Sequence, residues 1–172
     1  MSSKNTSATF PAELTIMLNC DGAFQASEHT GGWGFIVRDK DGTAWGAGAG
    51  RIKCVASAAQ AEIVACTNAA IEAANWGIGH VVFETDAANL VKAMQTTEYD
   101  LAPEGVLYRD LKSFIRLNFL SASFCFAPRT CNKIAHELAR WGVNQTQDRL
   151  LWPGGVTTFV NVLVGSESAE PI

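Results

Sequence analysis

The sequence predicts one α/β domain whose core is a mixed five-stranded sheet with helices on its faces. Three candidate strands follow one another near the start of the chain, joined by short glycine-containing segments, which is typical of an antiparallel meander. Two further candidate strands each follow a helical segment, and strands that return through a helix usually pair in parallel. The 172 residues are 48% hydrophobic and 17% charged, which fits one globular domain and excludes a disordered or coiled-coil chain.

We expect three regions along the chain: a loose leader over residues 1–13, the folded domain over 14–164, and a polar, acidic tail over 165–172. The start has no apolar h-region, and no apolar run approaches the length of a membrane span. We therefore expect no membrane association and an intracellular location, in the nucleus or the cytoplasm. The five cysteines are an odd number without metal-binding spacing, which indicates reduced, mostly buried thiols.

The first half of the chain contains the meander and a long helix. Strands are expected at 14–21, 33–38 and 43–52. In the first strand Leu14, Ile16 and Leu18 alternate along one face. The turn sequence DKDG at 39–42 predicts a hairpin between the second and third strands. Ser57 has the side chain of a helix N-cap, so we expect a helix from there to about residue 75.

The second half alternates strands and helices. A short apolar run at 80–85 indicates a buried central strand, and a helix is expected directly after it, at 87–94. Residues 95–103 are expected to form a loop, and apolar spacing predicts a helix over 104–117. A fifth strand at 122–127, with Phe124 and Phe126 on one face, and a last helix at 132–141 complete the predicted order.

Three acidic residues occupy positions where α/β proteins often place ligands. Asp21 closes the expected first strand, and the next residue, Gly22, has no side chain to keep a bulky ligand from the backbone. Glu62 lies on the small-residue face of the long helix, where a carboxylate is costly unless it is paired, protonated or bound to a metal. Asp86 lies where a buried strand ends and a helix begins, and ligands gather at such strand ends.

Each acidic residue also has an ordinary structural interpretation. Asp21 and Gly22 could form a strand-ending turn, Glu62 could pair with a basic residue at the sheet edge, and Asp86 could cap a helix. The set is more specific than its members because all three elements converge on one edge of the expected sheet. We expect the carboxylates to cluster there, on the order of 4–8 Å apart. Oxygen-only ligands of this kind suit Mg²⁺ or Mn²⁺.

Five segments, in order along the chain, carry a family resemblance. They are NCDGAF at 19–24, GWGFIVRD at 32–39, AE at 61–62, ETD at 84–86 and NKIAHELA at 132–139. Together they resemble the type 1 ribonuclease H family, and in particular the plant ribonuclease-H-like domains associated with non-LTR retroelement reverse transcriptases. The resemblance covers residues 14–142.

The resemblance implies a ribonuclease-H-like fold and a divalent-metal-dependent endonuclease that hydrolyses the RNA strand of RNA/DNA hybrids. Asp21, Glu62 and Asp86 are the implied metal ligands and catalytic residues, holding two Mg²⁺ ions. Family enzymes usually have a fourth carboxylate in the last helix, and plant-type relatives place His there as well as Asp. This chain has His136 at that position. The hypothesis gives His136 either weak binding of the second ion or a part in proton transfer and product release.

The expected contacts to nucleic acid lie near the acidic residues, at Gly22, Arg129, Asn132 and Lys133. Other positions depart from the family pattern. Ala58 and Ala59 replace polar, substrate-contacting residues of bacterial relatives, and Ala87 replaces a frequent Ser. The basic helical handle of some bacterial enzymes is not evident, and the net charge is −4, so bound cations must offset much of the repulsion from nucleic acid. These departures predict weak binding of hybrids.

Two other functions remain open at the level of sequence. The chain could be a non-catalytic module that binds nucleic acid or protein and has kept the fold of a retroelement enzyme. A 3′ exonuclease of the same broad superfamily is less favoured, because such enzymes usually have a second acid two residues after the first Asp, where this chain has Ala23. The sequence does not indicate an oligomeric state.

Overall fold

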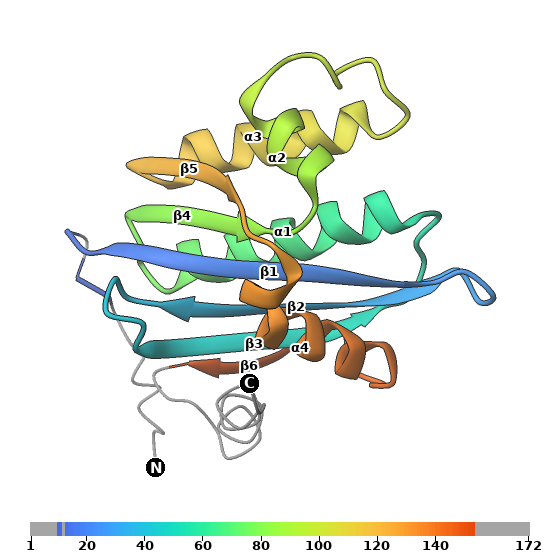
Figure 1. Ribbon diagram of the computed structural model, residues 1–172, viewed down its shortest axis with the longest axis horizontal. Coiled ribbons are helices and arrows are strands. Elements are labelled where there is room, and N and C mark those ends of the chain that lie inside the picture. The colour runs from blue at the N-terminus through green and yellow to red at the C-terminus, as the bar shows by residue number, and fades with distance from the viewer. Residues whose placement is uncertain (1–9, 12, 154–172) are drawn as a thin grey trace, which may run out of the picture.

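The computed structural model of the protein describes residues 10–11 and 13–153. Their strands form one mixed sheet of six strands in the order β5-β4-β1-β2-β3-β6 (Figure 1). The strand bounds are β1 Thr15–Gln25, β2 Thr30–Arg38, β3 Ala44–Ile52, β4 His80–Thr85, β5 Ser121–Phe126 and β6 Leu150–Pro153. β1, β2 and β3 pair in antiparallel fashion, whereas β4 pairs in parallel with both β1 and β5. The predicted combination of a meander with parallel crossover strands is therefore confirmed.

The sixth strand is a correction to the predicted five. β6 pairs antiparallel with β3, with Ala47 opposite Trp152. It is only four residues long, and such a short apolar segment contains too few residues for an alternating pattern to be recognised. The pairing adds β6 at the β3 edge of the sheet, away from β1 and β4.

Four α-helices cover the two faces of the sheet. They are α1 Ala58–Asn75, α2 Ala88–Gln95, α3 Gly105–Asn118 and α4 Lys133–Val143, and a short 3₁₀ helix, η1 Arg129–Cys131, precedes α4. The Ser57 hydroxyl accepts a hydrogen bond from the Gln60 N–H at 3.1 Å, so the predicted N-cap is confirmed. α1, α2 and α3 lie on one side of the sheet and α4 lies on the other (Figure 1). The alternation of β2 reflects this, since Phe35 packs in the α1 core and Ile36 packs with Ile134 of α4.

α4 approaches β2 closely because β2 has glycines on that face. A Cβ at Gly32 would collide with the backbone of Ala139, and a Cβ at Gly34 would lie 2.6 Å from the Ala139 nitrogen. No other residue type leaves this space, so the helix backbone rests directly on the strand. This contact fixes the height of α4 above the sheet.

Boundaries near the start of the chain differ from the prediction, and β2 begins at Thr30 rather than at residue 33. Asp21 does not close β1, because β1 continues to Gln25 with β2 as its antiparallel partner. Phe10, which we assigned to the loose leader, is only 6% exposed and stacks on Trp76, and its N–H donates to the Trp76 carbonyl at 3.3 Å. The rest of the expected leader except Pro11 and Glu13, the end of the domain after residue 153 and the predicted tail lie outside the described residues.

All five cysteines are free thiols. Cys20 and Cys66 are buried, but Cys54, Cys125 and Cys131 are exposed, so the expectation of mostly buried thiols was wrong. Among the described helices, none has both the length and the apolar character that crossing a membrane requires.

Candidate active site

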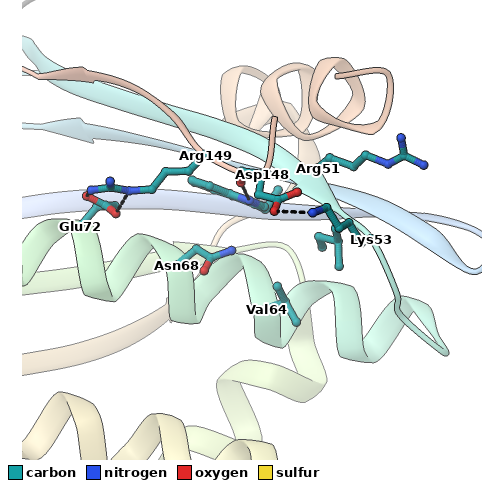
Figure 2. Close-up of a pocket in the computed structure, with 9 residues that line it drawn as sticks. Arg51, Lys53, Val64, Asn68, Glu72, Asp148 and Arg149 are labelled. Carbon is teal, nitrogen blue, oxygen red and sulfur yellow. Dashed lines mark hydrogen bonds and ion pairs between the residues drawn. The ribbon is translucent and has the colours of Figure 1, made fainter. Parts of the chain in front are cut away.

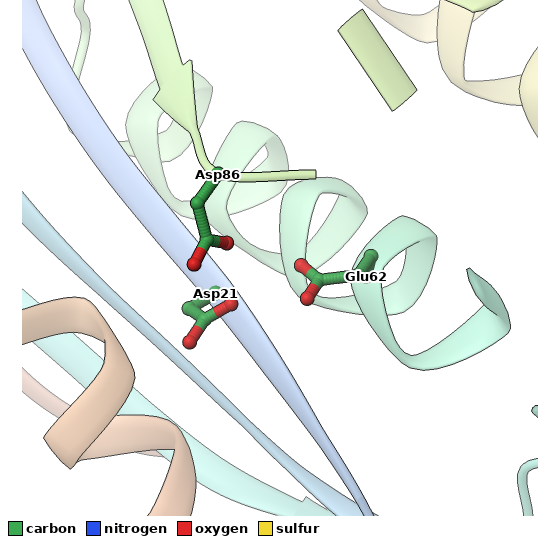
Figure 3. Close-up of side chains that lie close together, drawn as sticks. All are labelled: Asp21, Glu62 and Asp86. Carbon is green, nitrogen blue, oxygen red and sulfur yellow. The ribbon is translucent and has the colours of Figure 1, made fainter. Parts of the chain in front are cut away.

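Three elements bring the predicted carboxylates together at one edge of the sheet. Asp21 comes from the middle of β1, Glu62 from the second turn of α1, and Asp86 from the residue after β4. One oxygen of each carboxylate lies within 4.8 Å of the others, and the three side chains point toward one another (Figure 3). The parallel register explains part of this convergence, because Asn19 pairs with Glu84 and the chain positions two residues further on are Asp21 and Asp86.

Gly22 positions the carboxylate of Glu62. A Cβ at Gly22 would collide with the Ala61 carbonyl, so the glycine allows α1 to contact β1 backbone to backbone. The Gly22 N–H then donates to Glu62 Oε2 at 3.1 Å. The sequence interpretation expected open space here for a ligand. The structure corrects it, because α1 fills that space and Gly22 acts on Glu62 instead.

Burial makes the cluster electrostatically costly without a cation. Asp21 is 2% exposed, and burial raises its pKa. Burial, followed by the charge of Asp21, raises the pKa of Glu62 to about 10. These shifts favour one proton shared between Glu62 and Asp21 in the metal-free protein, with Glu62 as the group that retains it. A divalent cation would replace that proton and relieve the repulsion, and three oxygen donors at this spacing fit such an ion.

His136 reaches the cluster from the opposite face of the sheet. Its Nδ1 lies 2.7 Å from Asp21 Oδ2, and its side chain is 26% exposed. His136 comes this close to Asp21 because the backbone of α4 packs directly on β2. His136 therefore contacts the carboxylate that is most deeply buried, while part of its ring remains open to solvent.

The other predicted contacts differ in accessibility. Arg129 in η1 is 71% exposed, and its Nε lies 3.3 Å from Asp86 Oδ2. Lys133 is half-buried at the first residue of α4. Asn132 is only 1% exposed and donates to the Cys20 carbonyl at 3.0 Å, which corrects its assignment as a substrate contact. The amide group of Asn132 therefore makes its hydrogen bonds within the fold.

Glu84 lies beside the three carboxylates, and the sequence interpretation assigned it no contact there. Its Oε2 accepts a hydrogen bond from Asn19 Nδ2 at 2.9 Å, and Asn19 Nδ2 also lies 3.2 Å from Asn132 Oδ1. These three side chains join β1, β4 and the start of α4 directly beside the carboxylates. The period-two alternation of β4, which puts Glu84 on the same side as Asp86, was the available signal.

Two cavities adjoin α1. One, of about 290 Å³, opens beside Glu62 and has a largely alanine lining, formed by Ala58, Ala59, Glu62, Ala87, Ala88, Asn89, Leu90 and Tyr108. The other, of about 380 Å³, lies along the face of α1 that bears Val64, Asn68 and Glu72 (Figure 2). There the buried Glu72 accepts two hydrogen bonds from Arg149, at 2.5 and 2.8 Å, and Lys53 pairs with Asp148 at 3.1 Å. The pair of Glu72 with Arg149 ties α1 to the segment before β6.

Comparison with known proteins identifies the family. The family model described as reverse transcriptase-like matches residues 19–142, and no curated protein matches the chain. Among solved structures, the N-terminal RNase H domain of a Mycobacterium tuberculosis protein shares 19% identity with a TM-score of 0.69, covering 77% of this chain and 95% of that one. RNase H1 from Halobacterium salinarum shares 25% identity with a TM-score of 0.63, covering 76% and 98%.

A third similar structure is that of LC11-RNase H1 in complex with an RNA/DNA hybrid. It shares 19% identity with a TM-score of 0.69 and covers 75% of this chain and 96% of that one. Likeness at these identities establishes the fold, and the family-model match extends over most of the sheet and its helices. The chain therefore has a ribonuclease-H-like fold and belongs to the reverse transcriptase-like family.

Proposed function

We propose that the protein is a divalent-metal-dependent endonuclease that cleaves the RNA strand of RNA/DNA hybrids. The observation that supports this most directly is the convergence of Asp21, Glu62 and Asp86 within 4.8 Å from three separate elements. Clustered, partly buried carboxyl groups cost free energy unless a proton or a cation offsets their charges, and a divalent cation can do so for all three at once. The similarity to LC11-RNase H1, whose structure contains an RNA/DNA hybrid, supports the substrate class.

The position of each residue indicates its role in the proposed reaction. Asp21, Glu62 and Asp86 would hold Mg²⁺ or Mn²⁺, which when bound activates water and stabilises the leaving oxygen. Asp21 is held rigidly because it is buried in the middle of β1. His136 contacts Asp21 and is partly open to solvent, so it can orient that carboxylate and exchange a proton with water. Arg129, at the exposed rim, would contact a phosphate.

The finer classification is part of the same proposal. The histidine in α4 and the segments at 19–24 and 132–139 favour a plant-type domain derived from a non-LTR retroelement. For such a domain we expect an intracellular location, in the nucleus or the cytoplasm, where RNA/DNA hybrids form.

A second candidate function is a catalytically weak or inactive module that binds nucleic acid or protein. The alanine-lined cavity beside Glu62 favours it, because that surface offers few hydrogen bonds to a nucleic-acid backbone. The net charge of −4 also weakens non-specific attraction to nucleic acid.

Cleavage of an end-labelled RNA/DNA hybrid in Mg²⁺ or Mn²⁺ separates the two candidates. The proposed function expects metal-dependent internal cuts in the RNA strand, which disappear in Asp86→Asn. Asp110→Asn is the matched control, because Asp110 is an exposed residue of α3. Hybrid binding without cleavage in either metal would favour the module, and equal cleavage by wild type and Asp86→Asn would exclude this site.

A further inference from the structure

Asp86 already has a cationic partner in the metal-free protein. Arg129 Nε lies 3.3 Å from Asp86 Oδ2, and the two side chains are 71% and 11% exposed. Asp86 is also one of the three carboxylates whose oxygens converge within 4.8 Å. The guanidinium thus offsets part of the negative charge at the place where the proposed function puts a divalent cation.

The two cations compete for one carboxylate. An oxygen that accepts a hydrogen bond from Arg129 is less available as a metal ligand, and a guanidinium near a divalent cation repels it. The arginine contact is a single hydrogen bond near the protein surface, and surface pairs of this kind are weak. A divalent cation at Asp86 would therefore displace Arg129 at small cost.

The fold keeps a displaced Arg129 close to the site. Its backbone belongs to η1, where the Cys131 N–H donates to the Pro128 carbonyl at 2.8 Å and the Asn132 N–H donates to the Arg129 carbonyl at 3.0 Å. The buried side chain of Asn132 anchors this turn to β1. Only the long side chain is free to change direction, and a guanidinium released at the rim is suited to a phosphate.

We infer that Arg129 exchanges partners, pairing with Asp86 in the metal-free protein and contacting a backbone phosphate once a divalent cation occupies the site. The contact of Arg129 with a phosphate rests on the proposed function, since it requires nucleic acid as the partner. The exchange couples the two binding events, because metal binding makes one more cationic side chain available to nucleic acid. Metal binding would then raise the affinity for nucleic acid by more than the charge of the ion alone provides.

The first experiment measures Mn²⁺ binding by calorimetry without nucleic acid. Arg129→Gln removes the competing charge, so its Kd for Mn²⁺ should fall by about two- to fivefold. Arg140→Gln is the matched control, because Arg140 is 64% exposed on α4 and pairs with Glu137 rather than with the cluster. An Mn²⁺ affinity that is unchanged in Arg129→Gln, or changed equally in Arg140→Gln, overturns the exchange.

The second experiment counts phosphate contacts from the salt dependence of hybrid binding. It is run in Ca²⁺, an oxygen-seeking cation, and in a metal chelator. In Ca²⁺, the slope of log K against log salt should be smaller by about 1 for Arg129→Gln than for wild type, whereas in chelator the two slopes should agree. In the Asp86→Asn background, where Arg129 has lost its carboxylate partner, Arg129→Gln should reduce the slope in chelator as well.

The two experiments distinguish failure of the inference from failure of the proposed function. Equal slopes for wild type and Arg129→Gln in Ca²⁺ overturn the phosphate contact while leaving the cleavage assay unaffected. A wild-type protein that binds Mn²⁺ but no hybrid overturns the second half of the inference together with the proposed function. Circular dichroism of each variant tests whether the substitutions leave the fold intact.

Discussion

His136 Nδ1 and Asp21 Oδ2 lie 2.7 Å apart, although one residue belongs to the sheet and the other to the helix layer that covers it. Asp21 lies within the sheet, and His136 extends from α4, which packs on the face away from α1. The contact places an imidazole beside the carboxylates, at the position where the resemblance to type 1 ribonucleases H leads us to expect a fourth acid. It makes His136 the residue whose substitution most directly tests how the site selects a metal.

His136→Asp should change the metal preference. Mg²⁺ prefers oxygen ligands, whereas Mn²⁺ accepts imidazole more readily, so we expect wild type to cleave hybrids weakly in Mg²⁺ and faster in Mn²⁺. The aspartate variant should gain activity in Mg²⁺ and narrow the difference between the metals. Cleavage rates across Mg²⁺ and Mn²⁺ titrations measure this. His29→Asp, at an exposed loop residue, controls for the added charge. If both variants keep the wild-type preference, His136 does not act on the metal.

Asp86→Asn should leave the metal-free protein at least as stable as wild type. The substitution removes the negative charge of Asp86 from a cluster of three carboxyl groups and loses one ion pair, with the exposed Arg129. Divalent metal should raise the melting temperature of wild type by mass action, and this rise should be smaller in the variant. Differential scanning calorimetry with and without Mn²⁺ makes the comparison. A wild-type melting temperature that does not respond to metal would count against the site.

The stability of the metal-free protein should fall as pH rises. The pKa of Glu62 is raised from 4.5 to about 10 by burial and by Asp21, so the folded state binds more protons than the unfolded state between these values. Stability is therefore greatest below the unfolded pKa and declines as pH rises toward the folded one, by at most about 1.4 kcal/mol per pH unit for one proton. Urea unfolding in chelator from pH 5 to pH 9 measures the slope.

Glu62→Gln is the variant that isolates this effect. The amide retains an oxygen for the Gly22 N–H and a donor for Asp21, but it does not titrate. Its unfolding free energy should depend less on pH than that of wild type. Saturating Mn²⁺ should likewise flatten the wild-type profile. Equal slopes for wild type and Glu62→Gln in chelator would show that Glu62 is already ionised in the folded state.

The ion pair between Glu72 and Arg149 should stabilise the fold. The Glu72 side chain is 5% exposed and Arg149 supplies two hydrogen bonds, so Arg149→Ala leaves a buried carboxylate without its partner. We expect a loss of about 1–3 kcal/mol, the usual cost of such a group. Replacing both residues, Glu72→Leu with Arg149→Leu, should cost less than Arg149→Ala alone. Chemical denaturation tests this, and a double variant less stable than the single one would contradict it.

Gly22→Ala should disturb the site through the backbone. The new Cβ would lie 2.8 Å from the Glu62 nitrogen and closer still to Ala61, so α1 must move away from β1. Overpacking of this kind costs about 1–3 kcal/mol. Because Glu62 moves with α1, the melting-temperature response to metal should also weaken. Gly46→Ala is the control, because its Cβ meets the ring of Trp76 far from the carboxylates. Equal metal responses in the two variants would refute this role.

The sequence was sufficient for most of the sheet and for the three carboxylates. Alternation and turn residues predict the meander, and the apolar run at β4 predicts a central strand, because both depend on local patterns. The placement of Asp21 was less accurate. Asp followed by Gly is typical of a turn, but here the glycine serves a close approach of α1 that only the folded structure reveals.

Long-range contacts account for the remaining errors. Asn132 has the polarity of a substrate contact, yet its partners lie 112 and 113 residues earlier in the chain, at Cys20 and Asn19. Phe124 and Phe126 alternate as expected, but Phe124 stacks on Phe83 at 4.8 Å whereas Phe126 is 56% exposed. Periodicity assigns residues to a face, but it does not tell how far along a strand the covering helices reach.

The glycines of β2 have an evolutionary consequence. Because the backbone of α4 rests on Gly32 and Gly34, and the core contacts of α4 come from Ile134 and Leu138, the placement of the helix does not depend on the side chain at residue 136. A single nucleotide change can exchange histidine for aspartate there without repacking a core. A chain of this architecture can therefore exchange the group beside the acidic cluster while it keeps the scaffold that holds the cluster together.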